Sequence, residues 1–325
     1  MKYYPYLRAK QFELKALKEL VEQYREEVSG QLVPIIEPVN KEDRALTVAI
    51  DTFLQKGMRF ALVMNPYEGA FKHHNIQFSL PNADKMNAMR DRWIPAYVVN
   101  NNATAVQALI STHAYENVML VFPNGIDEAI SGMNNLLRMQ AVQCIVCNFN
   151  KTSRFMRGHL QEGNKTIICM DDNFNEQPKN ADYAGMVDEL FTENVFYYEQ
   201  DRYAGYSDYT ALPSNMQDGG MLPFAIAIHM TYLRTENQIY IHHFVSDTND
   251  TNKDTAKKFA EAGMKIINFY RERVDKTPSA VELIERSEKA NIDKFSAHAE
   301  GGYPGLGYLK KLSIKNHIEL LLNLR

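Results

Sequence analysis

The stretch QLVPIIEP (residues 31–38) is a short apolar run, rich in Val and Ile, that reaches a carboxylate at Glu37. Similar runs recur along the chain at fairly even spacing. Near-continuous apolar runs of this length are typical of strands that are buried on both faces of a parallel sheet. The other runs are RFALVMNP (59–66), WIPAYVVN (93–100), NVMLVFPN (117–124), VQCIVCNF (142–149), KTIICMDD (165–172), NVFYYEQ (194–200) and FAIAIHMTY (224–232).

Helical stretches separate most of these runs, most clearly at 41–56, 102–113, 126–139 and 181–190. Alternation of strand and helix predicts right-handed βαβ units. Eight such strands predict an α/β fold, a (β/α)8 TIM-like barrel. An open doubly wound sheet is the second interpretation, although the chain lacks the glycine fingerprint that usually opens such a nucleotide-binding fold.

The chain after the last run predicts extensions of the barrel. The segment 224–247 indicates a β-hairpin around the polar turn RTEN (234–237). Helices are expected at 252–273, 278–290 and 306–324, the second of them capped by Thr277. We therefore expect a single domain over 1–325, with a barrel core at about 31–273 and a helical extension at about 274–325.

Composition limits the class of protein. The net charge of −4 gives no global basic field. Binding of nucleic acid would therefore require local basic patches. No apolar run approaches the ~18–20 residues that span a bilayer, so no membrane partner is expected. The first residues do not have the pattern of a secretory signal. Together with the odd cysteine count, this predicts a reducing, cytoplasmic location.

The cysteines Cys144 and Cys147 form a Cys-x-x-Cys spacing, and Cys169 follows. Residues three apart on a strand point to opposite faces, so the spacing favours buried, reduced and unligated thiols over a redox or metal pair.

Polar side chains end six of the eight runs. In a barrel, the carboxyl ends of the strands build the active face. Glu37 and Asp171 are the strongest candidates, because carboxylates at an apolar mouth are costly to desolvate without a partner or a task. For the asparagines, including Asn65, turn formation and a role in the site are equally good interpretations. The polar ends are Glu37, Asn65, Asn100, Asn148, Asp171 with Asp172, and Glu199.

The segment YAGYSDYTALPSNMQDGGMLP (203–223) has no helical periodicity. A loop of this length inside a compact domain is usually functional or disordered. Its aromatic residues favour the functional interpretation.

Four segments carry a family resemblance: YYPYLRAKQFELKAL (3–17), VPIIEP (33–38), GYSDYTALP (205–213) and the hairpin AIHMTY with IYIHHFVSD (227–247). They resemble the phage and bacterial "beta protein" family, whose members are found in phages and in bacterial islands tied to phage conflict. The Ser in GYSDYT departs from the plain Gly-Asp-Tyr expected there. The resemblance implies a barrel, with an opening segment that crosses the mouth or plugs one end before the first strand. The residues matched one by one are Lys10, Glu13, Glu37, Asp208, Tyr209 and His229.

These residues suggest a site. Carboxylates with a histidine can bind a divalent metal or act as acid and base, so we expect Glu37, Asp171, Asp208 and His229 to be catalytic, with the metal unknown. Arg8 and Lys10 can hold a phosphate group, and Lys10 is expected to reach Glu37 or Asp208. Glu13, Asn65 and Tyr209 complete the predicted substrate-binding set.

The first functional hypothesis is a hydrolase of the phosphoester class, acting on a phosphate-bearing or nucleotide substrate in phage–host conflict, that is, in antiviral defence. The alternative is a non-catalytic sensor or binding subunit. It would use its C-terminal helices to dock a protein partner, such as a nuclease or another defence-module protein.

Overall fold

The computed structural model describes residues 1–41, 43–72, 78–216, 222–292 and 302–324, without the side chains of 25–29. Contacts group the chain into two compact units, which we describe separately. The first holds Met1–Asp172 and Asn194–Tyr209, and the second holds Asn173–Glu193 and Thr210–Arg325. The expectation of a single domain stays a prediction.

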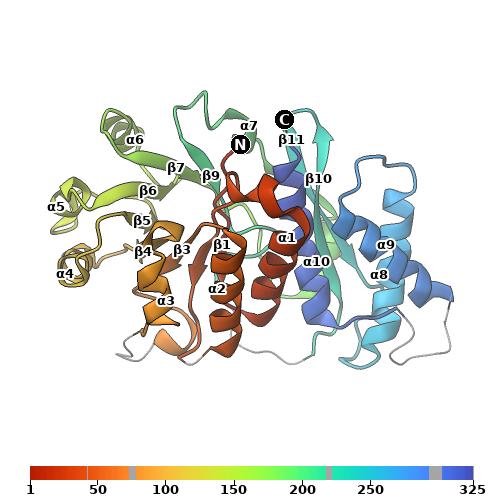
Figure 1. The fold of residues 1–325 in the computed structure, drawn as a ribbon. Coiled ribbons are helices and arrows are strands. Elements are labelled where there is room, and N and C mark those ends of the chain that lie inside the picture. The colour runs from red at the N-terminus through yellow and green to blue at the C-terminus, as the bar shows by residue number, and fades with distance from the viewer. Residues whose placement is uncertain (42, 73–77, 217–221, 293–301, 325) are drawn as a thin grey trace. The chain divides into compact units, whose positions relative to one another are not determined.

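The first unit is a (β/α)8 TIM-like barrel. Counted over the described residues, its sheet has eight strands in the order β1-β2-β3-β4-β5-β6-β7-β9, paired in parallel. Helices follow the strands, and α4, α5 and α6 lie outside β4 to β6 (Figure 1). The strands are β1 (Tyr6–Arg8), β2 (Ile35–Glu37), β3 (Phe60–Val63), β4 (Trp93–Val98), β5 (Val118–Phe122), β6 (Val142–Asn148), β7 (Thr166–Met170) and β9 (Gly205–Ser207).

The helices of this unit match the predicted stretches in part. Three of those expected contain α2, α4 and α5, whereas 181–190 holds a 3-10 turn and a strand of the second unit. The helices are α1 (Gln11–Ser29), α2 (Arg44–Lys56), α3 (Ala83–Ala88), α4 (Ala103–His113), α5 (Met133–Arg138), α6 (Arg154–Gln161) and α7 (Asn194–Tyr197), with the 3-10 turns η1 (Gly69–Phe71) and η2 (Arg90–Arg92).

Backbone hydrogen bonds between the start of the chain and β9 bring the two edges of the sheet together. The Tyr4 N–H donates to the Tyr206 carbonyl at 2.8 Å, and the Tyr6 N–H donates to the Asp208 carbonyl at 2.8 Å. In the other direction, the Tyr206 N–H donates to the Lys2 carbonyl at 3.0 Å. The first segment is therefore a strand of the barrel, and the prediction that it crosses or plugs an end was wrong.

Two predicted barrel strands lie elsewhere. Residues 194–200 begin with the helical turn α7; Val195 within this turn and Tyr198 directly after it, three residues apart, are both buried. Residues 224–232 overlap β10 (Ala227–Thr235), whose nearest partner is β11 (Gln238–Val245) in the hairpin predicted around RTEN. Short apolar runs do not distinguish a barrel strand from a buried helical turn or from a strand of another sheet.

The second unit contains a three-stranded antiparallel sheet, counted over the described residues, in the order β10-β11-β8, where β8 is Asp188–Thr192. The 3-10 turn η3 (Asn180–Gly185) precedes β8. The expected C-terminal helices are α8 (Thr255–Tyr270), α9 (Pro278–Ile292) and α10 (Leu306–Leu322). The predicted cap is confirmed, because the Thr277 hydroxyl accepts the Ala280 N–H at 3.1 Å. Within the described residues, we find no helix with the length and apolarity to cross a membrane.

Gly205 allows β9 to pack closely against the first segment. A Cβ atom at this position would lie 2.6 Å from Cε2 of the Tyr4 ring and 3.1 Å from the Lys2 carbonyl oxygen. The Tyr4 ring is buried, and the Lys2 carbonyl accepts a closing hydrogen bond, so neither neighbour moves away easily.

We predict that Gly205→Ala lowers the free energy of unfolding by about 1–3 kcal/mol, as overpacking does. Gly158→Ala in α6 is the control, because its Cβ would meet nothing within 4 Å and alanine favours a helix. Urea unfolding of both variants measures the difference. Equal stability of Gly205→Ala and the parent protein would contradict the role of Gly205 in closure.

The cysteines Cys144, Cys147 and Cys169 are buried free thiols. Burial raises the pKa of Cys144 to about 12 and that of Cys147 to about 11. We predict that a thiol-reactive dye at pH 8 labels none of them in the folded protein and all of them after denaturation. Rapid labelling of any cysteine in the folded protein would show that these strands open easily.

Candidate functional site at the carboxyl mouth of the barrel

Strand alternation decides which side chains enter the barrel. Tyr6, Ile35 and Val63 belong to one apolar cluster with residues from the other strands, which marks the inward positions. Side chains point to the same face at every second residue. Arg8, Glu37 and Asn65 therefore continue the inward rows at the carboxyl ends of β1, β2 and β3.

Glu37 is the most deeply placed of these groups, with an exposed fraction of 0%. Its Oε2 accepts the Tyr6 hydroxyl at 2.9 Å, and its Oε1 accepts the Tyr67 backbone N–H at 3.1 Å. Burial raises the pKa of Glu37, while the Tyr67 N–H, Arg8 and the Tyr6 hydroxyl oppose the shift without cancelling it. A carboxyl group with a raised pKa at a barrel mouth is suited to proton transfer.

Arg8 lies opposite Glu37 in the register of β1 and β2 and is buried. Its guanidinium carbon lies 5.4 Å from the centre of the Tyr209 ring. Burial alone would lower the pKa of Arg8, but Tyr6, Glu37 and Tyr209 outweigh burial and raise it. The mouth therefore holds a permanent cation beside a carboxyl group whose pKa is raised by burial.

Tyrosines line this pair. The rings of Tyr6 and Tyr209 lie 5.3 Å apart, and Tyr67 packs against the same inward cluster. Burial raises the pKa of Tyr6, Tyr67 and Tyr209, so their hydroxyl groups stay protonated and can donate. Next to Tyr67, the Oε2 atom of Glu68 is buried and has no hydrogen-bond partner among the described residues.

Asp171 and Asp208 are adjacent in sequence to the inward-facing Met170 and Tyr209, so alternation directs them to the other face of the sheet. Asp171 accepts the Tyr206 hydroxyl at 2.9 Å and the Asn194 side-chain amide at 2.9 Å. Asp208 accepts the Tyr3 hydroxyl at 2.6 Å. These hydrogen bonds join β7, β9, α7 and the first segment, so the two aspartates do not share a face with Glu37.

The remaining predicted site residues lie at different places in the fold. The side chain of Asn65 exchanges two hydrogen bonds of 2.9 Å with the Val98 backbone and so links β3 to β4. Glu13 is buried in the first turn of α1, and Lys10, partly buried, directly precedes that helix. The approach of Lys10 to Glu37 or Asp208 stays a prediction. His229 lies on β10, in the second unit.

Sequence reasoning missed Tyr6, Tyr67 and Glu68 as mouth residues. A signal was available for Tyr67, because it is two residues beyond Asn65 and so continues the inward row. Among the described residues, no group of three or more His, Cys, Asp or Glu side chains is arranged to hold a metal ion.

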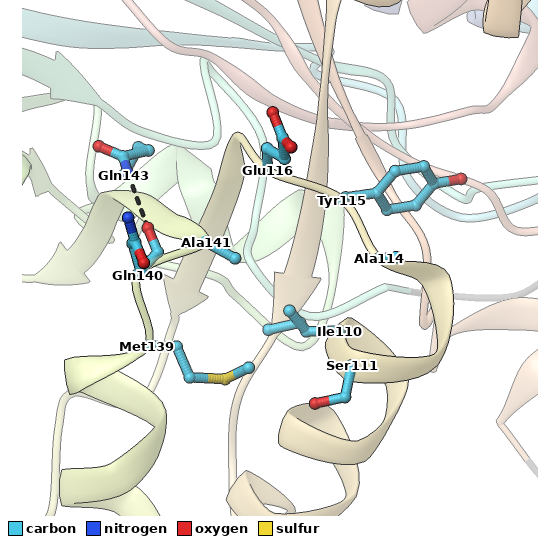
Figure 2. Close-up of a pocket in the computed structure, with 9 residues that line it drawn as sticks. All are labelled: Ile110, Ser111, Ala114, Tyr115, Glu116, Met139, Gln140, Ala141 and Gln143. Carbon is cyan, nitrogen blue, oxygen red and sulfur yellow. Dashed lines mark hydrogen bonds between the residues drawn. The ribbon is translucent and has the colours of Figure 1, made fainter.

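A pocket of about 580 Å³ lies away from this mouth. Tyr115 and Glu116, just before β5, and Gln143, near the start of β6, help to line it, as Figure 2 shows. It therefore lies at the amino ends of the strands. Active sites of (β/α)8 barrels are built at the opposite, carboxyl ends of the strands. We therefore do not assign the functional site to this pocket.

Comparisons of the chain with protein-family models, with curated proteins and with solved structures gave no match. The assignment of the site therefore depends on its own geometry.

Replacing Glu37 by Gln removes a charge that burial disfavours. Because the folded-state pKa of Glu37 is raised, ionisation at neutral pH costs stability. This cost disappears as the pH falls through the raised pKa towards the ordinary value, below which folded and unfolded chains are both protonated.

We predict that Glu37→Gln does not lower, and tends to raise, the free energy of unfolding at pH 7. The difference from the parent protein should shrink as the pH falls. Urea unfolding across this pH range measures it. The contrasting variant is Asp171→Ala, which removes two hydrogen bonds and should cost roughly 1–3 kcal/mol for each group left unpaired. A large loss of stability in Glu37→Gln would mean that its electrostatic attraction to Arg8 outweighs burial.

Proposed function

We propose that the barrel is a hydrolase of phosphate-bearing or nucleotide substrates, with Glu37 as its general acid or base. The observation that carries the proposal is the raised pKa of a fully buried carboxyl group at the carboxyl end of β2, next to the cation of Arg8. A buried carboxyl group with a raised pKa is suited to acid–base catalysis.

Arg8 supplies the partner for the phosphate. Its guanidinium group is planar and always charged, and it forms paired hydrogen bonds with phosphate oxygens. The neutral hydroxyl groups of Tyr67 and Tyr209 add donors, and the Glu68 Oε2 adds an acceptor. A ligand with anionic oxygens and a few hydroxyl or amino groups, such as a nucleotide, matches this set.

The role in phage–host conflict and the docking of a nuclease-like partner are further parts of the proposal and depend on the family resemblance. The proposal also includes dependence on a divalent metal. Turnover assays with and without a chelator test this dependence.

The test uses the full chain with a panel of nucleotides and phosphate esters, and it measures both binding and phosphate release. Glu37→Gln should keep binding and reduce turnover about 100-fold or more, the usual contribution of general acid–base catalysis. Glu116→Gln is the matched control, because this exposed residue lines the pocket at the amino ends of the strands. Its turnover should match that of the parent protein.

Arg8→Lys keeps the charge but loses the planar fork. We expect it to weaken phosphate binding about 10- to 100-fold, which corresponds to one hydrogen bond to a charged group. Arg138→Lys, on the exposed surface of α5, should bind as the parent protein does. Unchanged turnover in Glu37→Gln refutes the role of Glu37 as general acid or base. Binding without turnover in the parent protein supports the non-catalytic sensor instead.

A further inference from the structure

The second unit contains a chain of polar groups that the barrel site does not use. His229 on β10 and His243 on β11 are cross-strand partners, and their Nδ1 atoms lie 2.7 Å apart. The Nε2 of His243 lies 3.1 Å from Oε2 of Glu189 on β8. The three side chains therefore form one continuous row across the sheet.

The partners of Glu189 fix the direction of these hydrogen bonds. Its other oxygen, Oε1, accepts the Asn175 side-chain amide at 3.0 Å. The orientation of Asn175 is itself set, because its Oδ1 accepts the Gln177 side-chain amide at 3.1 Å. A carboxylate has acceptors only, so His243 donates to the Oε2 of ionised Glu189 from Nε2.

The tautomers of both histidines follow from this direction. A neutral His243 that carries its proton on Nε2 has a lone pair on Nδ1. The short contact between the two Nδ1 atoms then requires His229 to donate from Nδ1. The Nε2 of His229 is left without a proton, and it has no hydrogen-bond partner among the described residues.

The surroundings keep both rings neutral and in place. Burial and the neighbouring His243 lower the pKa of His229, and burial lowers that of His243 although Glu189 opposes the shift. The Tyr183 ring packs 4.7 Å from His229 and 4.8 Å from His243, and Phe174 lies 5.1 Å from His229. The other titratable groups that act on the pair are Tyr183 on η3, Asp188 on β8 and His242 on β11.

We propose that Glu189, His243 and His229 form a proton relay that lets His229 Nε2 take a proton from the hydroxyl group of a bound ligand. As the hydroxyl proton binds to Nε2, the Nδ1 proton of His229 moves to Nδ1 of His243. The positive charge then lies on His243, whose Nε2–H already donates to the Glu189 carboxylate. His229, which touches the ligand, ends the step neutral, so burial does not oppose it.

The relay requires His229, which meets the ligand, to be more exposed than His243. His243 has an exposed fraction of 3%, whereas His229 is only partly buried. His229 is therefore the end of the relay that meets a ligand, and His243 is a positioning residue. His242, the neighbour of His243, points to the opposite face and contacts Asp188 at 3.3 Å, so it serves as a control.

The first test is nitrogen NMR of the full chain with ¹⁵N-labelled histidine. At pH 7 we expect His229 as the Nδ1–H tautomer and His243 as the Nε2–H tautomer, assigned by the signals lost in His229→Gln and His243→Gln. On acidification, His243 should become the imidazolium before His229. A proton on Nε2 of His229 at pH 7, or earlier charging of His229, overturns the relay.

Variants of Glu189 separate positioning from folding. Glu189→Gln keeps an oxygen that accepts the Nε2–H of His243 and should preserve both tautomers. Glu189→Leu removes the acceptor and should give a mixture of tautomers, while His242→Gln should change neither ring. Unchanged tautomers in Glu189→Leu would refute the assignment of Glu189.

Diethyl pyrocarbonate tests whether the free nitrogen is accessible, because it acylates unprotonated imidazole. Peptide mapping by mass spectrometry should show modification of His229 well before that of the buried His317. Equal protection of the two residues would show that no ligand reaches Nε2 and would refute the proposal. None of these outcomes depends on the barrel hydrolase.

Discussion

The barrel depends on a few backbone hydrogen bonds between residues 2–6 and residues 206–208. Without them the first unit would be an open sheet with β1 and β9 as exposed edges. The side chains reinforce this seam from outside the barrel, since Tyr3 donates to Asp208 and Tyr206 donates to Asp171. The tyrosines at the start of the chain are therefore explained by closure: Tyr4 and Tyr6 face inward, and Tyr3 faces outward.

Strand alternation places the buried carboxylates at the strand ends on two opposite faces of the sheet. Glu37 and Arg8 face the interior, while Asp171 and Asp208 hold the seam from the opposite face. Glu37 also accepts two hydrogen bonds, but it faces the interior beside Arg8, and burial raises its pKa. The geometry therefore favours Glu37 over the two aspartates as the group available for chemistry.

Six barrel strands were predictable because their apolar runs extend over several residues. The two closing strands were not, since neither Tyr6–Arg8 nor Gly205–Ser207 lies within an extended aliphatic run. Their contact with each other joins segments about 200 residues apart, which no local pattern encodes. Within the site, the inward direction of Glu37 follows from period two. Its raised pKa does not, because it depends on tertiary burial and on donors from β1 and the segment after β3.

Closure of the sheet also has a consequence for biosynthesis. Strand β1 can pair with β2 soon after both are made, but its other edge must wait for β9, some 200 residues later. At a synthesis rate of about 5–20 residues per second, that delay is roughly 10–40 s. During this interval the nascent sheet has an unsatisfied edge, the kind of surface that molecular chaperones protect. The strand that completes the native barrel is thus also the last barrel strand to leave the ribosome.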